Sequence, residues 1–243
     1  MKIVCFYGQR HVKLWLKITV LFLTLTGIGA AITHTAFMVG HSYVHSTFRI
    51  GIDPGHGGID SGTLFGSLKE KDFNLVFAKK LAARFAAAGF QTTLSRNEDQ
   101  LLSPLARYEN RGQPYKRDDL QRRLEVLQAA QVVAIISVHT NWSRYRFRRG
   151  PSVFASPHSR VSGLLAGAIQ GQLNEVQPYT KLPKTASYYI LRQAKVPIVL
   201  VEIGYISNPD DRYLLQCQNY QEQLCDAIIR GFQAAIPILQ ASN

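Results

Sequence analysis

Runs of apolar and polar residues along the chain predict short strands separated by helices. Residues 48–52 alternate and include β-branched side chains, which is typical of a short buried strand. Residues 132–138 and 197–201 are apolar throughout, which predicts central strands covered on both faces. Further strands are predicted at residues 90–94, 151–156 and 188–191.

Helical periodicity appears between these strands. Helices are predicted at residues 68–88, 118–130, 161–176 and 220–236. Gly89 is placed to end the first helix, and Pro237 to end the last. Residues 59–67 are predicted as a loop, and residues 97–117 as a polar surface excursion rather than a second domain.

Length and charge bound the kind of protein. The chain has 243 residues, and after its amino-terminal apolar segment about 200 remain, which suits one globular domain. The formal net charge is +12, and residues 49–243 keep +8 from 24 basic and 16 acidic residues. A basic domain favours an anionic partner, for which cell wall fits as well as nucleic acid or a membrane surface.

Residues 18–40 contain no charged side chain and are long enough to span a hydrocarbon core of about 30 Å. The basic residues of segment 1–17 precede this run, so the positive-inside rule predicts that this segment is a cytoplasmic tail and that residues 18–40 are a transmembrane anchor. A linker at 41–47 then leads to an extracytoplasmic domain at residues 48–243. A cleaved signal peptide is the alternative, with residues 21–28 as its apolar core. We favour the uncleaved anchor, because the apolar run continues past the small residues that would form a cleavage site.

The three cysteines do not predict a disulfide framework. Cys5 falls on the predicted cytoplasmic side, and Cys217 and Cys225 are too far apart for a comfortable bridge if both are helical. We expect Cys225 to pack in the core, and we assign no cysteine to chemistry.

Candidate chemistry lies where predicted strands end. His56 follows strand 48–52 in a glycine-rich turn, His139 follows strand 132–138, and Glu202 follows strand 197–201. In an open parallel sheet, ligands and metals collect beyond the carboxyl ends of strands. Glu70, near the start of a predicted helix, is the fourth candidate.

Each candidate also has a structural interpretation. The turn around His56 could carry its histidine incidentally, and residues 67–70 form a capping box in which Glu70 would bond a backbone N–H. A hold on Glu202 by backbone N–H groups is the less favoured alternative for that residue. Against this, two histidines and a carboxylate form the usual catalytic zinc set, and a further glutamate can accept a proton from water.

The segments IDPGHGGIDSG, LKEKDFNL, SVHTNW and VEIGYISNPDDRYLL resemble, in that order, the motifs of zinc-dependent N-acetylmuramoyl-L-alanine amidases of the amidase_3 type. The resemblance covers about residues 48–236. It implies a single α/β domain with a twisted, mostly parallel sheet of about six strands flanked by helices. It also implies that His56, Glu70 and His139 bind one zinc ion per chain and that Glu202 is the catalytic acid and base.

This resemblance predicts a peptidoglycan hydrolase that cleaves the amide between N-acetylmuramic acid and L-alanine of the stem peptide. Within the family, the single anchor and the arginine-bearing segment at residues 115–127 look most like the germination-specific amidases of spore formers. An inactive wall-binding module of the same fold and a membrane-tethered basic binding protein are the alternatives. We expect peptidoglycan and the membrane as partners, no nucleic acid, and leave open an activating protein.

Several residues are candidates for contact with the substrate. Asn141 follows His139, and Arg123 belongs to helix 118–130. An arginine-aromatic loop after His139 contains Arg144 and Arg146, together with Arg148 and Arg149. Arginines can bind the carboxylates of a stem peptide, although such residues are more often solvated. Asp53 is a candidate to orient His56 by accepting a hydrogen bond, with capping of the turn as its alternative role.

Overall fold

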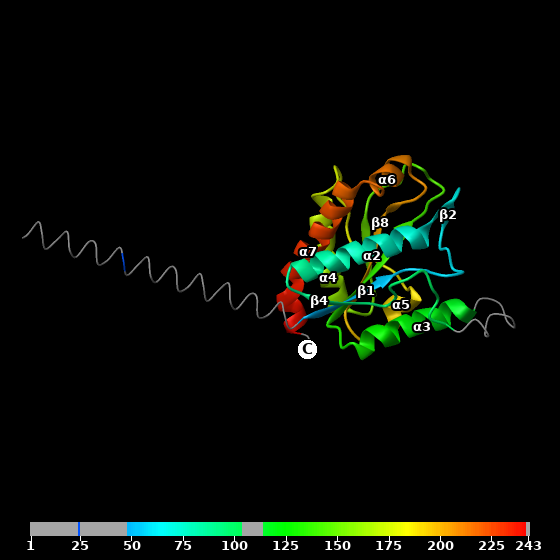
Figure 1. Ribbon diagram of the computed structural model, residues 1–243. Coiled ribbons are helices and arrows are strands. Elements are labelled where there is room, and N and C mark those ends of the chain that lie inside the picture. The colour runs from blue at the N-terminus through cyan, green and yellow to red at the C-terminus, as the bar shows by residue number, and fades with distance from the viewer. Residues whose placement is uncertain (1–23, 25–47, 104–113, 242–243) are drawn as a thin grey trace, which may run out of the picture. The chain divides into compact units, whose positions relative to one another are not determined.

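The computed structural model describes residues 24, 48–103 and 114–241, and the described residues from 48 onward belong to one compact unit (Figure 1). The predicted basic tail, apolar segment and linker lie outside the described residues, apart from Thr24. In the described part of the chain, no helix is both long and apolar enough to cross a bilayer.

A six-stranded sheet forms the centre of the unit, in the order β4-β1-β5-β8-β6-β7. Its parallel strands are β4 (Gln91–Leu94), β1 (Arg49–Pro54), β5 (Ala134–Asn141) and β8 (Ile198–Tyr205). β6 (Ser152–Ala155) runs antiparallel to β8, and β7 (Lys184–Thr185) pairs with β6 in parallel. The predicted single α/β domain with a mostly parallel sheet is confirmed.

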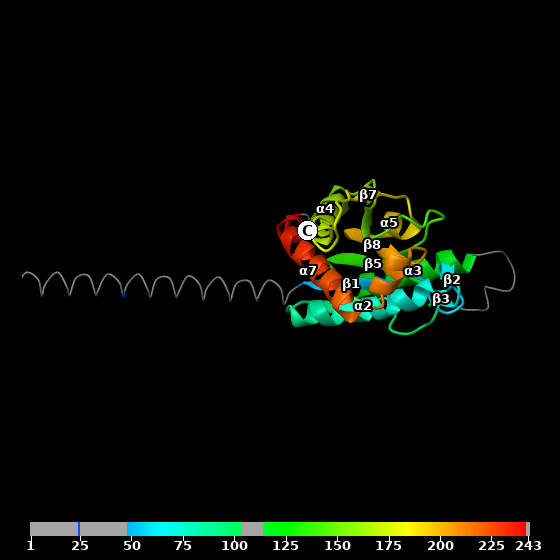
Figure 2. The same ribbon diagram turned by 90° about the horizontal axis from the view of Figure 1, so that it is seen from above.

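Helices cover both faces of this sheet. On one face, α2 (Glu70–Ala87) packs on β1, β4 and β5, and α4 (Arg160–Asn174) packs on β6 and β8. α7 (Gln218–Gln240) contacts both helices (Figure 2). On the other face, α3 (Pro114–Ala129) packs on β1, and the short α5 (Tyr189–Gln193) packs on β8 and α3.

Apolar side chains fill both sides of the sheet. Leu124 and Leu127 of α3 join Leu191 of α5 against Ile135 and Leu200 of the central strands. On the opposite face, three phenylalanine rings meet edge to face at centroid separations of 5.5–5.6 Å: Phe85, Phe90 and Phe232. The core therefore holds β5 and β8, the strands that carry two candidate site residues.

Three predicted element assignments are wrong. Residues 188–191, predicted as a strand, enter α5, because so short an apolar run fits either element. α7 continues past Pro237 to Gln240, since Ile236 and Leu239 are buried on either side of the proline and their packing outweighs the lost hydrogen bond. The predicted loop at 59–67 contains β2 (Leu64–Phe65), which pairs with β3 (Leu68–Lys69) in a hairpin.

Candidate metal centre and active site

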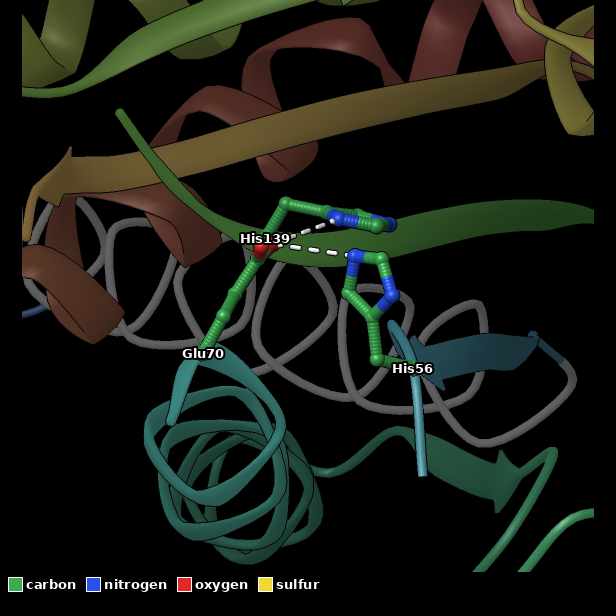
Figure 3. Close-up of side chains that lie close together, drawn as sticks. All are labelled: His56, Glu70 and His139. Atoms are coloured by element: carbon green, nitrogen blue, oxygen red, sulfur yellow. Dashed lines mark hydrogen bonds and ion pairs between the residues drawn. The ribbon is translucent and has the colours of Figure 1, made fainter. Parts of the chain in front are cut away.

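The three predicted metal ligands lie together at the carboxyl end of the central strands. His56 follows β1, His139 lies on β5, and Glu70 is the first residue of α2. Glu70 Oε1 is 3.2 Å from His56 Nε2 and 3.0 Å from His139 Nδ1 (Figure 3). The donor atoms of all three residues lie within 4.8 Å of one another.

Two glycines make room for this cluster. A Cβ atom on Gly55 would lie 2.3 Å from the His139 ring, and one on Gly62 would lie 2.6 Å from Glu70 Oε2. His56 itself has φ +63°, a left-handed conformation that a non-glycine residue adopts at an energetic cost. Glycine is therefore required at positions 55 and 62 for the three side chains to lie this close together.

Glu70 does not cap its helix. Lys69 is the N-cap of α2 and makes no side-chain cap hydrogen bond. The Glu70 carboxylate instead accepts hydrogen bonds from the N–H groups of Thr63 (2.9 Å) and Thr140 (3.2 Å). These bonds fix the carboxylate between the two histidines, and the capping-box alternative is excluded.

His56 is oriented by Asp60 rather than by Asp53. The Nδ1 atom of His56 lies 2.8 Å from Asp60 Oδ2, which leaves Nε2 directed toward Glu70. Asp53 is fully buried and accepts hydrogen bonds from Ser95 Oγ (2.6 Å) and Ser137 Oγ (2.7 Å). The role predicted for Asp53 in orienting His56 is wrong, because its side chain lies beneath the site, between neighbouring strands.

Arg123 is likewise part of the interior, so its predicted contact with substrate is wrong. Its side chain is 0% exposed and donates to Asp119 Oδ2 at 2.6 Å, and Nη1 lies 3.3 Å from Asp53 Oδ1. The remaining guanidinium N–H groups donate to the carbonyl oxygens of Pro54 and His56. Arg123 therefore holds the backbone that presents His56.

Electrostatic coupling within the cluster is strong. Burial lowers the pKa of His56, but hydrogen bonds to the Asp60 and Glu70 carboxylates outweigh this and raise it to about 9. Burial raises the pKa of Glu70, yet hydrogen bonds from His139 and His56 hold it well below its usual range. The same cluster of one carboxylate and two imidazoles suits a divalent cation, which would take the place of the shared protons.

Glu202 faces a cavity of about 580 Å³ that the three ligands also line. It sits on β8 opposite His139 of β5. In the described part of the chain its buried Oε2 has no hydrogen-bond partner. Burial, together with the negative charge of Glu70, raises the pKa of Glu202 to about 8. A buried carboxyl with a free oxygen is positioned to exchange protons with a molecule in the cavity.

The other predicted substrate-binding residues lie at different distances from this cavity. Asn141 lines it. Arg144 and Arg146 do not: Arg144 donates to the Tyr145 hydroxyl, and the Arg146 guanidinium lies 5.7 Å from the Phe65 ring centroid. Substrate contact by these residues stays a prediction.

Sequence reasoning missed some lining residues. Lys116 at the start of α3 lies 3.3 Å from Asp60, and Tyr188 and Tyr189 reach the cavity from the segment around α5. The spacing of His56 and Asp60, four residues apart in a glycine-rich loop, was the available signal for their pairing. The tyrosines gave none, because their segment was predicted as a strand.

Comparisons with known proteins agree with this geometry. A family model described as N-acetylmuramoyl-L-alanine amidase matches residues 50–234. The germination-specific N-acetylmuramoyl-L-alanine amidase of Bacillus subtilis is 28% identical over 184 residues, which cover 74% of this chain and 76% of that protein. The amidase LytC of the same organism is 30% identical over 213 residues, but this chain covers only 39% of LytC.

A solved structure shows the same fold. The CwlD amidase of Clostridioides difficile, determined in complex with the GerS lipoprotein, superposes with a TM-score of 0.73 at 29% sequence identity. The match covers 79% of this chain and 100% of that chain.

Proposed function

The chain belongs to the N-acetylmuramoyl-L-alanine amidase family, and from this premise we propose that its cavity performs zinc-dependent hydrolysis of peptidoglycan, with Glu202 transferring the protons. Members of this family cleave the amide between N-acetylmuramic acid and L-alanine of the stem peptide. One observation carries the proposal: two imidazoles and the carboxylate between them face one cavity together with Glu202, whose Oε2 has no hydrogen-bond partner among the described residues.

The donor set fits zinc. His56 Nε2, His139 Nδ1 and a Glu70 oxygen are the ligand types of catalytic zinc sites, which use three protein donors. Asp60 on the far nitrogen of His56 is the usual partner of a metal-binding histidine. A bound Zn²⁺ would supply Lewis acidity, which activates water and polarises the scissile carbonyl group.

Glu202 is the proposed acid and base. Its free oxygen takes a proton from the attacking water and then gives it to the nitrogen of the departing L-alanine. In the metal-free site the pKa of Glu202 is raised to about 8, and the charge of a bound cation would favour the ionised form that accepts a proton. Because water is the nucleophile, hydrolysis needs no covalent intermediate with the enzyme.

The biological setting is a finer part of the proposal. We place the domain outside the cytoplasmic membrane, held by the apolar segment 18–40, and acting on cell wall or spore cortex. The similarity to a germination-specific amidase supports the cortex role. The lipoprotein complex of the CwlD amidase supports a protein partner for this chain as well.

The test measures metal and activity separately. The purified full chain should hold one zinc. It should release stem peptides from peptidoglycan that carry L-alanine as a new amino terminus, and it should create no new reducing ends. Glu202→Gln should keep zinc and lose at least about a hundredfold in rate, whereas His139→Ala should lose the metal. The matched controls Glu175→Gln and His158→Ala change exposed residues and should behave like wild type.

Two outcomes would contradict the scheme. Full activity in a strong chelator would exclude a role of the metal in catalysis. Loss of zinc in Glu202→Gln would make Glu202 a metal ligand instead of the proton carrier.

A further inference from the structure

A second pocket, outside the catalytic cavity, gathers positive charge. It has a volume of about 390 Å³. Four cationic side chains line it, together with the rings of Phe147, Tyr179 and Tyr205: Arg148, Arg149, Lys181 and Lys184. We call it the cationic pocket.

Two of its charges are not neutralised by the protein. Arg148 and Lys184 are exposed, and neither forms an ion pair with a carboxylate in the described residues. Arg149 pairs with Asp210 at 3.2 Å. The nearby Asp211 is buried, and its Oδ2 accepts hydrogen bonds from the backbone N–H groups of Tyr205 and Gly150. The protein thus leaves the pocket with a surplus of positive charge.

The pocket is held in shape by its own contacts. Lys181 Nζ donates to the Gly150 carbonyl at 2.8 Å and to Ser152 Oγ at 3.2 Å, which ties the arginine loop to β6. The same ammonium group lies 5.5 Å from the ring centroids of both Tyr179 and Tyr205. Lys181 is therefore used for support, while Arg148 and Lys184 remain available to a ligand.

The cationic pocket adjoins the catalytic cavity. Lys184 Nζ lies 5.6 Å from the Phe154 ring centroid, and the Phe154 ring lies 5.9 Å from that of Tyr188, which lines the catalytic cavity. Phe154 pairs with Lys184 on one side and with Leu200, another cavity residue, on the other. Leu200 and Lys184 are therefore separated by two strand spacings of about 4.8 Å each. An extended peptide of about three residues can span this distance.

From this placement we propose that the cationic pocket binds a carboxylate of the stem peptide whose amide bond is cleaved next door. The inference rests on the proposed function, since it assigns the second pocket to the same substrate. A stem peptide carries its own carboxylates, its length fits the distance, and an arginine can bind a carboxylate through two hydrogen bonds. Of the four loop arginines predicted to bind stem-peptide carboxylates, Arg148 and Arg149 line this pocket, whereas Arg144 and Arg146 do not.

The experiment measures peptide binding rather than catalysis, by calorimetry on the full chain. The probes are a stem tetrapeptide with free carboxylates and the same peptide with its carboxylates amidated. The test variant is Arg148→Gln with Lys184→Gln. The matched control is Lys79→Gln with Arg160→Gln, which removes two exposed charges away from both cavities.

Wild type and the control should bind the free acid at least about tenfold more tightly than the amide, because a charge-assisted hydrogen bond is worth about 1.5 kcal/mol or more. The test variant should bind both peptides with the affinity that wild type shows for the amidated peptide. Hydrolysis of peptidoglycan by wild type, followed in parallel, tests the proposed function independently of this binding.

Three results would overturn the inference while leaving the amidase function standing: no preference of wild type for the acid, an unchanged preference in the test variant, or an equal loss in the control. Pocket-dependent binding of polyglycerol phosphate without binding of the peptide would also overturn it, and would assign the pocket to a phosphate polymer.

Discussion

Replacement of Arg123 by methionine should destabilise the protein severely, although the side chain is roughly isosteric and lies outside the metal ligands. Arg123 is fully buried and shares hydrogen bonds or ion pairs with Asp53 and Asp119, both of which are also buried. The substitution therefore leaves two carboxylates in the interior without their cation.

The magnitude follows from that uncompensated charge. Removal of one partner of a buried ion pair costs about 3–5 kcal/mol, a large part of a typical stability of about 5–15 kcal/mol. Arg123→Lys should lose less, about 1–3 kcal/mol, because lysine keeps the charge but lacks the planar fork that reaches Asp119 and the Pro54 and His56 carbonyl groups.

The assay is urea unfolding of the full chain at pH 7, followed by far-ultraviolet circular dichroism. Arg122→Met is the matched control, since Arg122 is the exposed neighbour on α3 and should change stability by no more than about 0.5 kcal/mol. Adding Asp53→Asn to Arg123→Met should recover part of the loss, because it removes one of the unpaired charges.

Acid should narrow the difference between wild type and Arg123→Met. Burial raises the pKa of Asp53, but Arg123 and the two serine hydroxyls outweigh it and hold the pKa below 3.8. A lowered carboxyl pKa stabilises the fold above pH 3.8, and this stabilisation disappears as pH falls through the folded-state pKa. A loss at pH 7 of under 1 kcal/mol, or one that grows in acid, would refute the reasoning.

Three further outcomes are expected. Gly55→Ala should abolish high-affinity zinc binding by titration, because its Cβ would lie 2.3 Å from the His139 ring, whereas Gly163→Ala, with open space around it, should bind zinc normally. Metal-free wild type should lose up to about 1.4 kcal/mol of unfolding free energy per pH unit between pH 4.5 and 6.5, because the raised pKa of Glu202 favours the protonated fold, and Glu202→Gln should lack this slope. Above pH 6.5 the raised pKa of His56 adds a loss that both proteins share. Phe232→Ala should lower the unfolding free energy by about 3–5 kcal/mol through the cavity it leaves between two other rings; a loss below 1 kcal/mol would show that the core closes over the gap.

The sequence was sufficient for the parts of the site that local patterns determine. His56 and Glu202 adjoin apolar strand runs, and a parallel sheet brings such positions to one edge. The structure places His56, Glu70 and His139 in one cluster, as their resemblance to a known motif set implied.

Partners that lie far apart in sequence could not be found in this way. Helical spacing places Arg123 on the apolar face of α3 with Leu120 and Leu127, but its partner Asp53 lies 70 residues earlier in the sequence, so the buried ion pair could not be predicted. Asp53 was assigned to His56 by proximity in sequence, but strand alternation turns its side chain away toward Ser95 and Ser137.

Short elements were the other source of error. α5 has five residues and β7 two, so neither contains enough periods for helix and strand to be separated by pattern. Their identity is decided by packing: Ile190 and Leu191 are buried against the sheet core, and Lys184 pairs with β6 at its edge.

The complete burial of β8 has a consequence for amide hydrogen exchange. All eight of its residues are buried, and it is bonded on both sides, to β5 and to β6, so its amides should exchange only when the whole domain unfolds. β7 is a two-residue strand at the edge of the sheet, and its amides should exchange through local opening. Glu202 would then sit on the slowest-exchanging backbone of the domain, while Lys184, two strands away, sits on backbone that opens and recloses many times in the life of one folded molecule.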